Sequence, residues 1–343
     1  MVDYRTIDDN KNCWYNPDVG SSVEQLITRR GYPFESYEIT TEDGYINIMY
    51  RIPHNNTNHN STRQPVLLHP GFSGSPLTFL TIGNRSLAFF LVNNGFDVWL
   101  PNRRGIIVNN SQGHLYLKRT DKEFWDYSFH ESGYYDIKAE VDFIANQTEG
   151  AGKIIYIGYS MGTTESYIYA SLRKEHANKH IAGIISLAPV AFMKHLKGVL
   201  AKVAPYSSFL EADLSAFIKN GPVSTSVKTL VHFSQEMHAG GNFQHYDYGP
   251  AKNVLLYDSN TPPSYNLSEI EVPVHLFCGD ADLIADKEDV LMLYNKLTVK
   301  NKSLIAISPD KNVKFSHADF ALAKNIRELL HEVLLKTINE NLR

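Results

Sequence analysis

The fold is decided by the stretch Ile154-Ile155-Tyr156-Ile157, which runs directly into Gly158-Tyr159-Ser160-Met161-Gly162. The apolar run predicts a buried strand, and the residues after the second glycine predict a helix. A G-x-S-x-G sequence between a strand and a helix is typical of a sharp turn that exposes a nucleophilic serine, because the glycines leave room for the backbone. We therefore nominate Ser160 as a nucleophile, against the alternative of an ordinary serine in a glycine-rich turn.

Strand and helix patterns alternate on both sides of this turn. Such alternation predicts an α/β fold with a mainly parallel central sheet flanked by helices. Two strands, at 36–40 and 45–50, flank Glu42-Asp43-Gly44 and predict a hairpin. The further strands are expected at 66–69, 96–100, 154–157, 181–188, 272–277 and 303–307. Helices are expected at 87–93 and 135–146, after the serine turn, and as one final helix over 319–339.

The alternation stops after residue 188 and resumes at about residue 271. Short amphipathic pieces with Gly and Pro fill the interval, which predicts an insertion packed over the sheet edge as a cap. The expected organisation is a hydrolase-type core at 1–188, a cap at 189–270 and the second part of the core at 271–343.

Composition narrows the class of protein. The chain has 343 residues, of which 43% are hydrophobic, enough for one large core or for one core plus a cap. Its 33 basic and 37 acidic residues are mixed along the chain, so nucleic acid is not an expected partner. An apolar run of membrane-spanning length is missing, so no transmembrane segment is expected. Of the two cysteines, Cys13 and Cys278, the second ends an apolar run and is expected to be buried rather than disulfide-bonded.

The expected location is extracellular or lysosomal. The first residues lack the apolar core of a signal peptide, which fits a mature chain whose signal was removed. Seven N-x-S/T sequons are present, more than asparagine content alone explains. They are Asn55, Asn60, Asn84, Asn109, Asn146, Asn266 and Asn301. The alternative is a cytoplasmic protein with unused sequons.

A serine nucleophile needs a base, and the base needs an acid to orient it. In α/β-hydrolases the order along the chain is Ser, acid, His. The strand ending at Phe277 runs into Cys278-Gly279-Asp280-Ala281-Asp282, and we choose Asp282 because it lies three residues past the strand-end glycine. Asp280 is expected to be a turn residue and Asp286 a helix cap.

The base is expected to be His317, which follows the last strand in Phe315-Ser316-His317 and comes after both Ser160 and Asp282. His331 falls within the final helix and is expected on its surface. The order Ser160, Asp282, His317 and their positions after strands together predict a catalytic triad.

Two backbone amides are expected to hold an oxyanion: those of Met161, next to the nucleophile, and of Phe72, in the turn after the earlier strand. Neither a metal nor a cofactor is expected. His176 and His180 have the i, i+4 spacing of a helical metal pair, but Ala177 stands where a zinc protease carries its glutamate. Nearby cations indicate a solvated helix end instead.

The chain resembles the acid lipases, the family of gastric and lysosomal acid lipase. Nearly the whole chain carries the resemblance. Its motifs are Arg30-Gly31-Tyr32-Pro33, Thr41-Glu42-Asp43-Gly44-Tyr45, Gly95-Phe96-Asp97-Val98-Trp99-Leu100, Glu123-Phe124-Trp125-Asp126-Tyr127-Ser128-Phe129, Gly158-Tyr159-Ser160-Met161-Gly162-Thr163-Thr164, Phe243-Gln244, Tyr246-Asp247-Tyr248-Gly249, Gly279-Asp280-Ala281-Asp282-Leu283-Ile284-Ala285-Asp286 and His317-Ala318-Asp319-Phe320. The resemblance implies an α/β-hydrolase fold and places nucleophile, acid and base on Ser160, Asp282 and His317.

Three departures from the family pattern stand out. Pro70-Gly71 replaces the usual His-Gly, and Gly-Tyr-Ser-Met-Gly replaces the usual Gly-His-Ser-Gln-Gly around Ser160. The part of the cap between Pro189 and about Ser224 is much shorter than in the gastric and lysosomal enzymes. A shortened lid predicts a more open acyl groove and less dependence on a lipid–water interface.

The expected function is hydrolysis of acylglycerols or related lipid esters through an acyl-enzyme, with transient contact between the protein and a lipid surface. Two alternatives remain open at this point: a sterol or small-ester esterase with the same triad, and a catalytically impaired lipid-binding homologue.

Overall fold

A computed structural model describes residues 18–53, 63–106, 108, 112–148, 151–196, 225–308 and 314–342. These residues form one eight-stranded sheet in the order β1-β2-β4-β3-β5-β6-β7-β8. The strands are β1 Glu35–Thr40, β2 Ile46–Ile52, β3 Pro65–His69, β4 Asp97–Pro101, β5 Ile154–Tyr159, β6 Ile181–Leu187, β7 Val274–Gly279 and β8 Lys302–Ile307. Within this described sheet β2 runs antiparallel to both of its neighbours, β1 and β4, and all the other strand pairs are parallel. The predicted α/β class, hairpin and mainly parallel sheet are confirmed.

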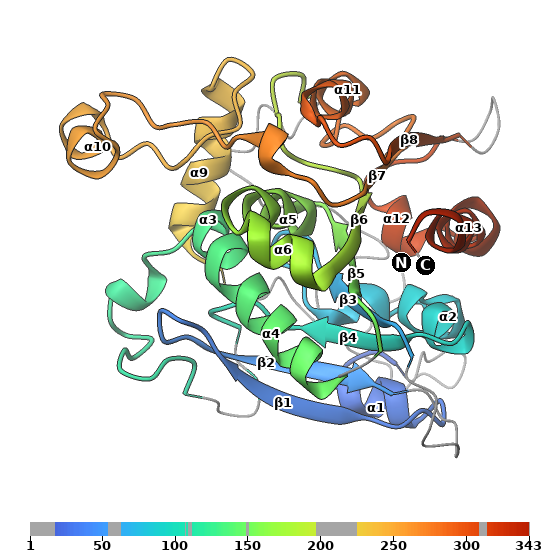
Figure 1. The fold of residues 1–343 in the computed structure, drawn as a ribbon. Coiled ribbons are helices and arrows are strands. Elements are labelled where there is room, and N and C mark those ends of the chain that lie inside the picture. The colour runs from blue at the N-terminus through green and yellow to red at the C-terminus, as the bar shows by residue number, and fades with distance from the viewer. Residues whose placement is uncertain are drawn as a thin grey trace, which may run out of the picture.

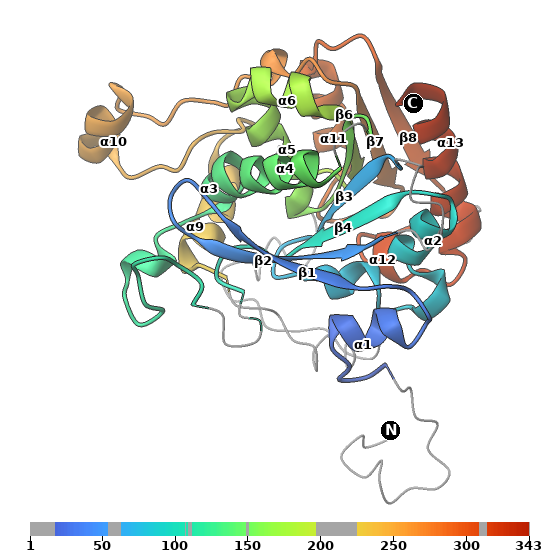
Figure 2. The same ribbon diagram turned by 60° about the horizontal axis from the view of Figure 1, so that its bottom comes forward.

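Helices cover both faces of the sheet (Figures 1 and 2), with α4, α5 and α6 on one face and α2 and α13 on the other. The described α-helices are α1 Val23–Thr28, α2 Leu87–Asn93, α3 Phe129–Glu131, α4 Ile137–Gln147, α5 Met161–Leu172, α6 Lys174–His180, α9 Val227–His238, α10 Pro250–Tyr257, α11 Lys287–Lys296, α12 Asp319–Leu322 and α13 Glu332–Asn341. Short 3-10 turns occur at η2 Pro76–Phe79, η3 Gly83–Arg85, η4 Glu123–Trp125 and η6 Leu267–Glu269, and π-helical turns at η5 Ser132–Asp136 and η7 Arg327–His331.

Burial on both faces explains the continuous apolar runs of the central strands. Every residue of β3, β4 and β7 is buried, as expected for parallel strands covered by helices on both sides. Cys278 in β7 is a buried free thiol, as predicted, whereas Cys13 lies outside the described residues.

The parallel strands β5, β7 and β8 end at the same edge of the sheet. Ser160 follows β5 directly, Asp282 follows β7 within three residues, and His317 follows β8 after a loop. The topology therefore gathers these side chains from segments far apart in sequence, because ligand and catalytic groups of open α/β sheets lie beyond the carboxyl ends of the strands.

The prediction of one final helix over 319–339 is wrong. Two helices, α12 and α13, occupy this segment, and the π-helical turn η7 leads into the second. Ala323 ends α12 with extended backbone angles, and Arg85 donates hydrogen bonds to the carbonyls of Ala323 and Lys324. Because a side chain from another element satisfies these carbonyls, the chain can leave the helix there.

The expectation of a surface position for His331 is also wrong. Its side chain is buried, and its ring centroid lies 5.1 Å from that of Phe90 on α2. Burial lowers the pKa of His331 to about 4, so the ring packs in the core as a neutral group.

Between β6 and β7 the chain leaves the layered core. Helix α9 lies beside α3, and α10 projects away from the sheet in both views (Figures 1 and 2). Residues 197–224, which include most of the segment predicted to be shortened, lie outside the described residues. No helix in the ranges given above is both long and apolar enough to cross a membrane.

Helix α9 carries a buried carboxyl group, that of Glu236. Its Oε1 accepts a hydrogen bond of 3.1 Å from the Gln244 amide, and burial raises the pKa of Glu236 to about 9. Nearby His232 is held neutral, since burial lowers its pKa to about 3. In the folded protein Glu236 is therefore the uncharged acid, whereas in the unfolded chain its carboxyl group ionises near its ordinary pKa.

Because the folded pKa of Glu236 is raised, its contribution to stability is complete below about pH 4.5 and is lost as the pH rises toward 9. Glu236→Gln, which mimics the neutral acid, is expected to flatten the fall in melting temperature across this interval. Thermal unfolding at a series of pH values measures the slope. The matched control is Glu340→Gln, an exposed side chain on α13. Equal slopes in both variants and the parent would contradict the assignment.

Candidate active site

Ser160 stands at a strained turn between β5 and α5. Its backbone angles are φ 53° and ψ −120°, in the left-handed range that a non-glycine residue rarely adopts. A Cβ added to Gly158 would lie 2.7 Å from the carbonyl oxygen of Gly162, and one added to Gly162 would lie 2.5 Å from the carbonyl oxygen of His69. Both glycines are therefore required by close backbone contact, which is the physical reason for the G-x-S-x-G pattern.

A chain of two hydrogen bonds joins the three residues nominated from the sequence. The Nε2 of His317 lies 2.8 Å from the Oγ of Ser160, and its Nδ1 lies 2.8 Å from the Oδ2 of Asp282. The side chain of His317 is 16% exposed and that of Asp282 is fully buried. This arrangement lets His317 accept the hydroxyl proton of Ser160 while its Nδ1–H donates to a carboxylate.

Backbone amides fix the carboxylate of Asp282. Its Oδ1 accepts hydrogen bonds from the amides of Ile284 at 2.8 Å and Ala285 at 2.9 Å, which leaves Oδ2 for the histidine. Asp280 instead accepts from the amide of Phe315 and so ties the end of β7 to the loop before His317. Asp286 caps the N-terminus of α11, as predicted.

The residues nominated for the oxyanion lie next to the nucleophile. The amide of Ser160 donates to the Leu187 carbonyl at 2.9 Å. The next amide, that of Met161, lies in the first turn of α5, where backbone amides have no acceptor within the helix. Gly71, which precedes Phe72, is so close that an added Cβ would lie 3.1 Å from the Cβ of Ser160.

A buried charged cluster, which the sequence analysis missed, lies directly behind this turn. It consists of Arg103, Glu165, His69 and Glu140, all nearly inaccessible to solvent. Arg103 forms a two-pronged ion pair with Glu165, with N···O distances of 2.9 Å. His69 Nδ1 lies 3.0 Å from Glu165, and its Nε2 lies 3.5 Å from Glu140.

Attraction between opposite charges favours the ionised forms of His69 and Glu165. Burial disfavours protonation of His69, but Glu165 and Glu140 outweigh it and raise the pKa of His69 to about 9. Burial alone would raise the pKa of Glu165, but Arg103 and His69 hold that pKa below its ordinary value. A charged residue on the nucleophile helix, five positions after Ser160, was the available sequence signal.

The cluster also fixes the loop that carries Phe72. The guanidinium of Arg103 donates hydrogen bonds to the carbonyls of Pro70 and Gly71. Because Arg103 presents several donors in a rigid fork, one side chain orients both the loop carbonyls and Glu165 on the nucleophile helix. The side chain of Arg103 thus fixes the position of the loop relative to the serine turn.

Tyr159, one of the departures from the family pattern, contacts the base. Its hydroxyl donates a 3.0 Å hydrogen bond to the backbone carbonyl of His317, and the two rings lie 5.3 Å apart. The residue before the nucleophile therefore helps to position the loop that carries the histidine.

Tyr159→Phe removes this hydrogen bond and keeps the ring. With a net value of about 0.5–1.5 kcal/mol for one hydrogen bond, kcat is expected to fall about two- to tenfold with little change in KM. Steady-state hydrolysis of a soluble ester measures both constants. Tyr32→Phe is the matched control, since its hydroxyl bonds Asn93 far from the site. An unchanged kcat in Tyr159→Phe would refute the positioning role.

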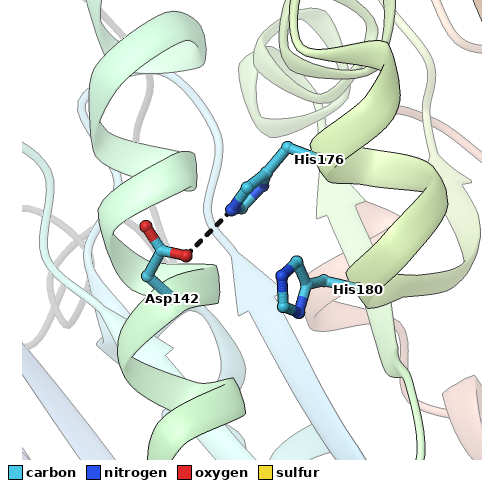
Figure 3. Close-up of side chains that lie close together, drawn as sticks. All are labelled: Asp142, His176 and His180. Carbon is cyan, nitrogen blue, oxygen red and sulfur yellow. Dashed lines mark hydrogen bonds and ion pairs between the residues drawn. The ribbon is translucent and has the colours of Figure 1, made fainter.

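A third potential metal ligand lies close to His176 and His180, the histidine pair with i, i+4 spacing. Asp142 on α4 lies beside His176 and His180 of α6, and the ligand atoms of the three lie within 4.8 Å of one another (Figure 3). Asp142 could not be recognised from the sequence, because it is 34 residues away from His176.

Comparisons with known proteins show the fold and the family of this chain. Residues 64–312 match the model of the alpha/beta hydrolase fold, and residues 23–83 match the partial alpha/beta-hydrolase lipase region. Gastric triacylglycerol lipase of Bos taurus is 33% identical over 380 aligned positions that cover 95% of this chain and 93% of the relative. A tear acid lipase-like protein of Mesocricetus auratus is also 33% identical and covers 95% of this chain and 94% of its own length.

Among solved structures, a soluble variant of the monoglyceride lipase of Saccharomyces cerevisiae superimposes with a TM-score of 0.57. It covers 96% of this chain and 100% of its own at 16% identity, which shows a shared fold. The chain therefore belongs to the α/β-hydrolase family and, within it, to the acid lipase family that includes gastric triacylglycerol lipase.

Proposed function

We propose that this chain hydrolyses lipid esters, with Ser160 as nucleophile, His317 as general base and Asp282 as the acid that orients the base. The observation that carries the proposal is the pair of 2.8 Å hydrogen bonds from Ser160 to His317 and from His317 to Asp282. The membership of the acid lipase family supports the same reaction.

In the first step His317 Nε2 takes the proton of the Ser160 hydroxyl as its oxygen attacks the ester carbonyl. Asp282 stabilises the imidazolium that forms, and the amides of Met161 and Phe72 hold the oxyanion. His317 then gives the proton to the departing alcohol, which leaves an acyl-serine. A water molecule deprotonated by His317 attacks the acyl-serine and releases the fatty acid.

The proposed substrates are acylglycerols and related lipid esters. One relative is named a triacylglycerol lipase and another an acid lipase-like protein, and the neighbouring yeast structure is a monoglyceride lipase. Sterol esters and small esters share the reaction and differ in the alcohol part. An inert lipid-binding role is disfavoured, because binding a lipid does not require a hydrogen-bonded chain of nucleophile, base and acid.

We further propose that 189–270 form a cap over the site. The ring of Phe233 on α9 lies 5.9 Å from that of Phe72, so this segment contacts the loop beside the nucleophile. The alignment with the bovine gastric lipase spans 380 positions, more than the 343 residues of this chain, so this chain lacks residues that the relative has, as a shorter insertion requires. A shorter lid favours access to Ser160 without a lipid surface, although transient contact with one remains part of the proposal.

Secretion or delivery to lysosomes is proposed from the sequons. Four of the seven lie in described residues, and all four asparagines are exposed: Asn84, Asn146, Asn266 and Asn301. Exposure is what glycan attachment requires.

The catalytic assignment predicts a graded loss of activity. Ser160→Ala and His317→Ala are each expected to lower kcat by about a million-fold, and Asp282→Asn by about ten-thousand-fold, with folding retained. Hydrolysis of a chromogenic short-chain ester measures the rates. Asp280→Asn, whose carboxylate bonds Phe315 instead of His317, is the matched control and should keep a far larger fraction of activity. Normal turnover in His317→Ala would refute the assignment of the base.

The shortened cap predicts the response to a lipid surface. Rates on a partly soluble triacylglycerol are expected to rise smoothly as its concentration passes the solubility limit, because the site is open in water. A sharp increase in the hydrolysis rate at that limit would show that the cap closes the site in water, which would contradict the proposal of an open site. Emulsified long-chain and sterol esters, assayed in parallel, rank the substrate classes.

A further inference from the structure

A group of three potential metal ligands lies on the face of the sheet that α4, α5 and α6 cover, away from the triad. His176 and His180 stand one turn apart on α6, and Asp142 reaches them from α4 (Figure 3). Residues four apart on a helix share one face, so the two imidazoles point toward the same space. Their ring centroids lie 4.7 Å apart.

We propose that Asp142, His176 and His180 bind a divalent transition metal ion, with Zn²⁺ as the best match. Two imidazole nitrogens and one carboxylate oxygen form a donor set that zinc accepts, with water in the fourth position. Zinc ligand atoms in a tetrahedral site lie about 3.3 Å apart, given metal–ligand distances of about 2.0–2.1 Å. The present separations, between 2.9 Å and 4.8 Å, need only small side-chain movements to reach that geometry.

A hydrogen-bonding partner already supports the first histidine. The hydroxyl of Tyr169 on α5 lies 2.7 Å from His176 Nδ1, and Nε2 faces the Oδ1 of Asp142 at 2.9 Å. When Nε2 binds a metal, the neutral ring carries its proton on Nδ1 and donates it to the tyrosine oxygen, as metal-bound histidines commonly do. The proton moves within the ring and none is lost overall.

The two oxygens of Asp142 have different partners. Lys138 lies 2.8 Å from Oδ2, which leaves Oδ1 for the metal. Side-chain exposures of 41% for Asp142 and 17% for His176 leave a path for an ion from solvent. Lys138 repels a second cation, so it lowers the affinity of the site without blocking it.

The sequence expectation of no metal rested on Ala177 and on the nearby cations. Ala177 excludes only the zinc-protease arrangement. The third ligand comes from another helix. A bound ion would link α4 to α6 across α5, the helix that begins after Ser160, and would stabilise this layer without entering the reaction. The proposal is independent of the proposed hydrolase function.

The test is metal binding to the full-length protein without an affinity tag, after treatment with EDTA. Titration with Zn²⁺ by calorimetry is expected to show one saturable site, and Co²⁺ to give the intense visible absorption of a four-coordinate site. His176→Ala and His180→Ala should each weaken binding at least tenfold, and Lys138→Gln should strengthen it. Thermal unfolding with and without Zn²⁺ should show stabilisation of the parent protein but not of His176→Ala or His180→Ala.

Two controls locate the ion. His195→Ala removes a histidine that contacts Asp289 and Glu288, and His317→Ala removes the histidine of the triad. Both variants are expected to keep the site, and circular dichroism checks that every variant is folded. Failure of the parent protein to bind Zn²⁺, or binding that survives loss of His176 and His180, would overturn the proposal. Loss of binding in either control would overturn it as well.

Discussion

The close approach of two backbones at the serine turn is the constraint on which the rest of the site depends. Gly162 at the start of α5 lies so near the carbonyls of His69 and Pro70 that no side chain fits between them. This contact presses the nucleophile helix against the end of β3, and it forces Ser160 into a conformation that only the surrounding structure can maintain. The hydroxyl is thereby placed at the sheet edge where His317 arrives from β8.

Buried charged side chains connect the loop after β3 to the nucleophile helix α5. Arg103 bonds both the loop carbonyls and Glu165, and His69 adds a second positive charge on the other side of the same carboxylate. A buried ion pair of this kind is weak evidence for stability, because desolvation offsets much of the attraction. Its value here is geometric, since it fixes the oxyanion loop relative to the nucleophile.

Most of the correct predictions from the sequence rest on local patterns. The strand before Ser160, the helix at α2 and the order of Ser160, Asp282 and His317 follow from periodicity and from the rule that parallel strands end at one edge. The catalytic roles remain predictions, although the three side chains do meet. What escaped prediction depends on contacts between distant residues: Arg103 with Glu165, 62 positions apart, Asp142 with His176, and Arg85 with the break after α12.

An active-site-directed phosphonate ester tests whether Ser160 is an activated nucleophile. After brief exposure to the reagent, intact mass and peptide mapping are expected to show one covalent adduct, located on the peptide that carries Ser160. Ser160→Ala should show none, and His317→Ala should react far more slowly, because the serine loses its base. An adduct on another residue, or no adduct on folded protein, would show that Ser160 is not an activated nucleophile.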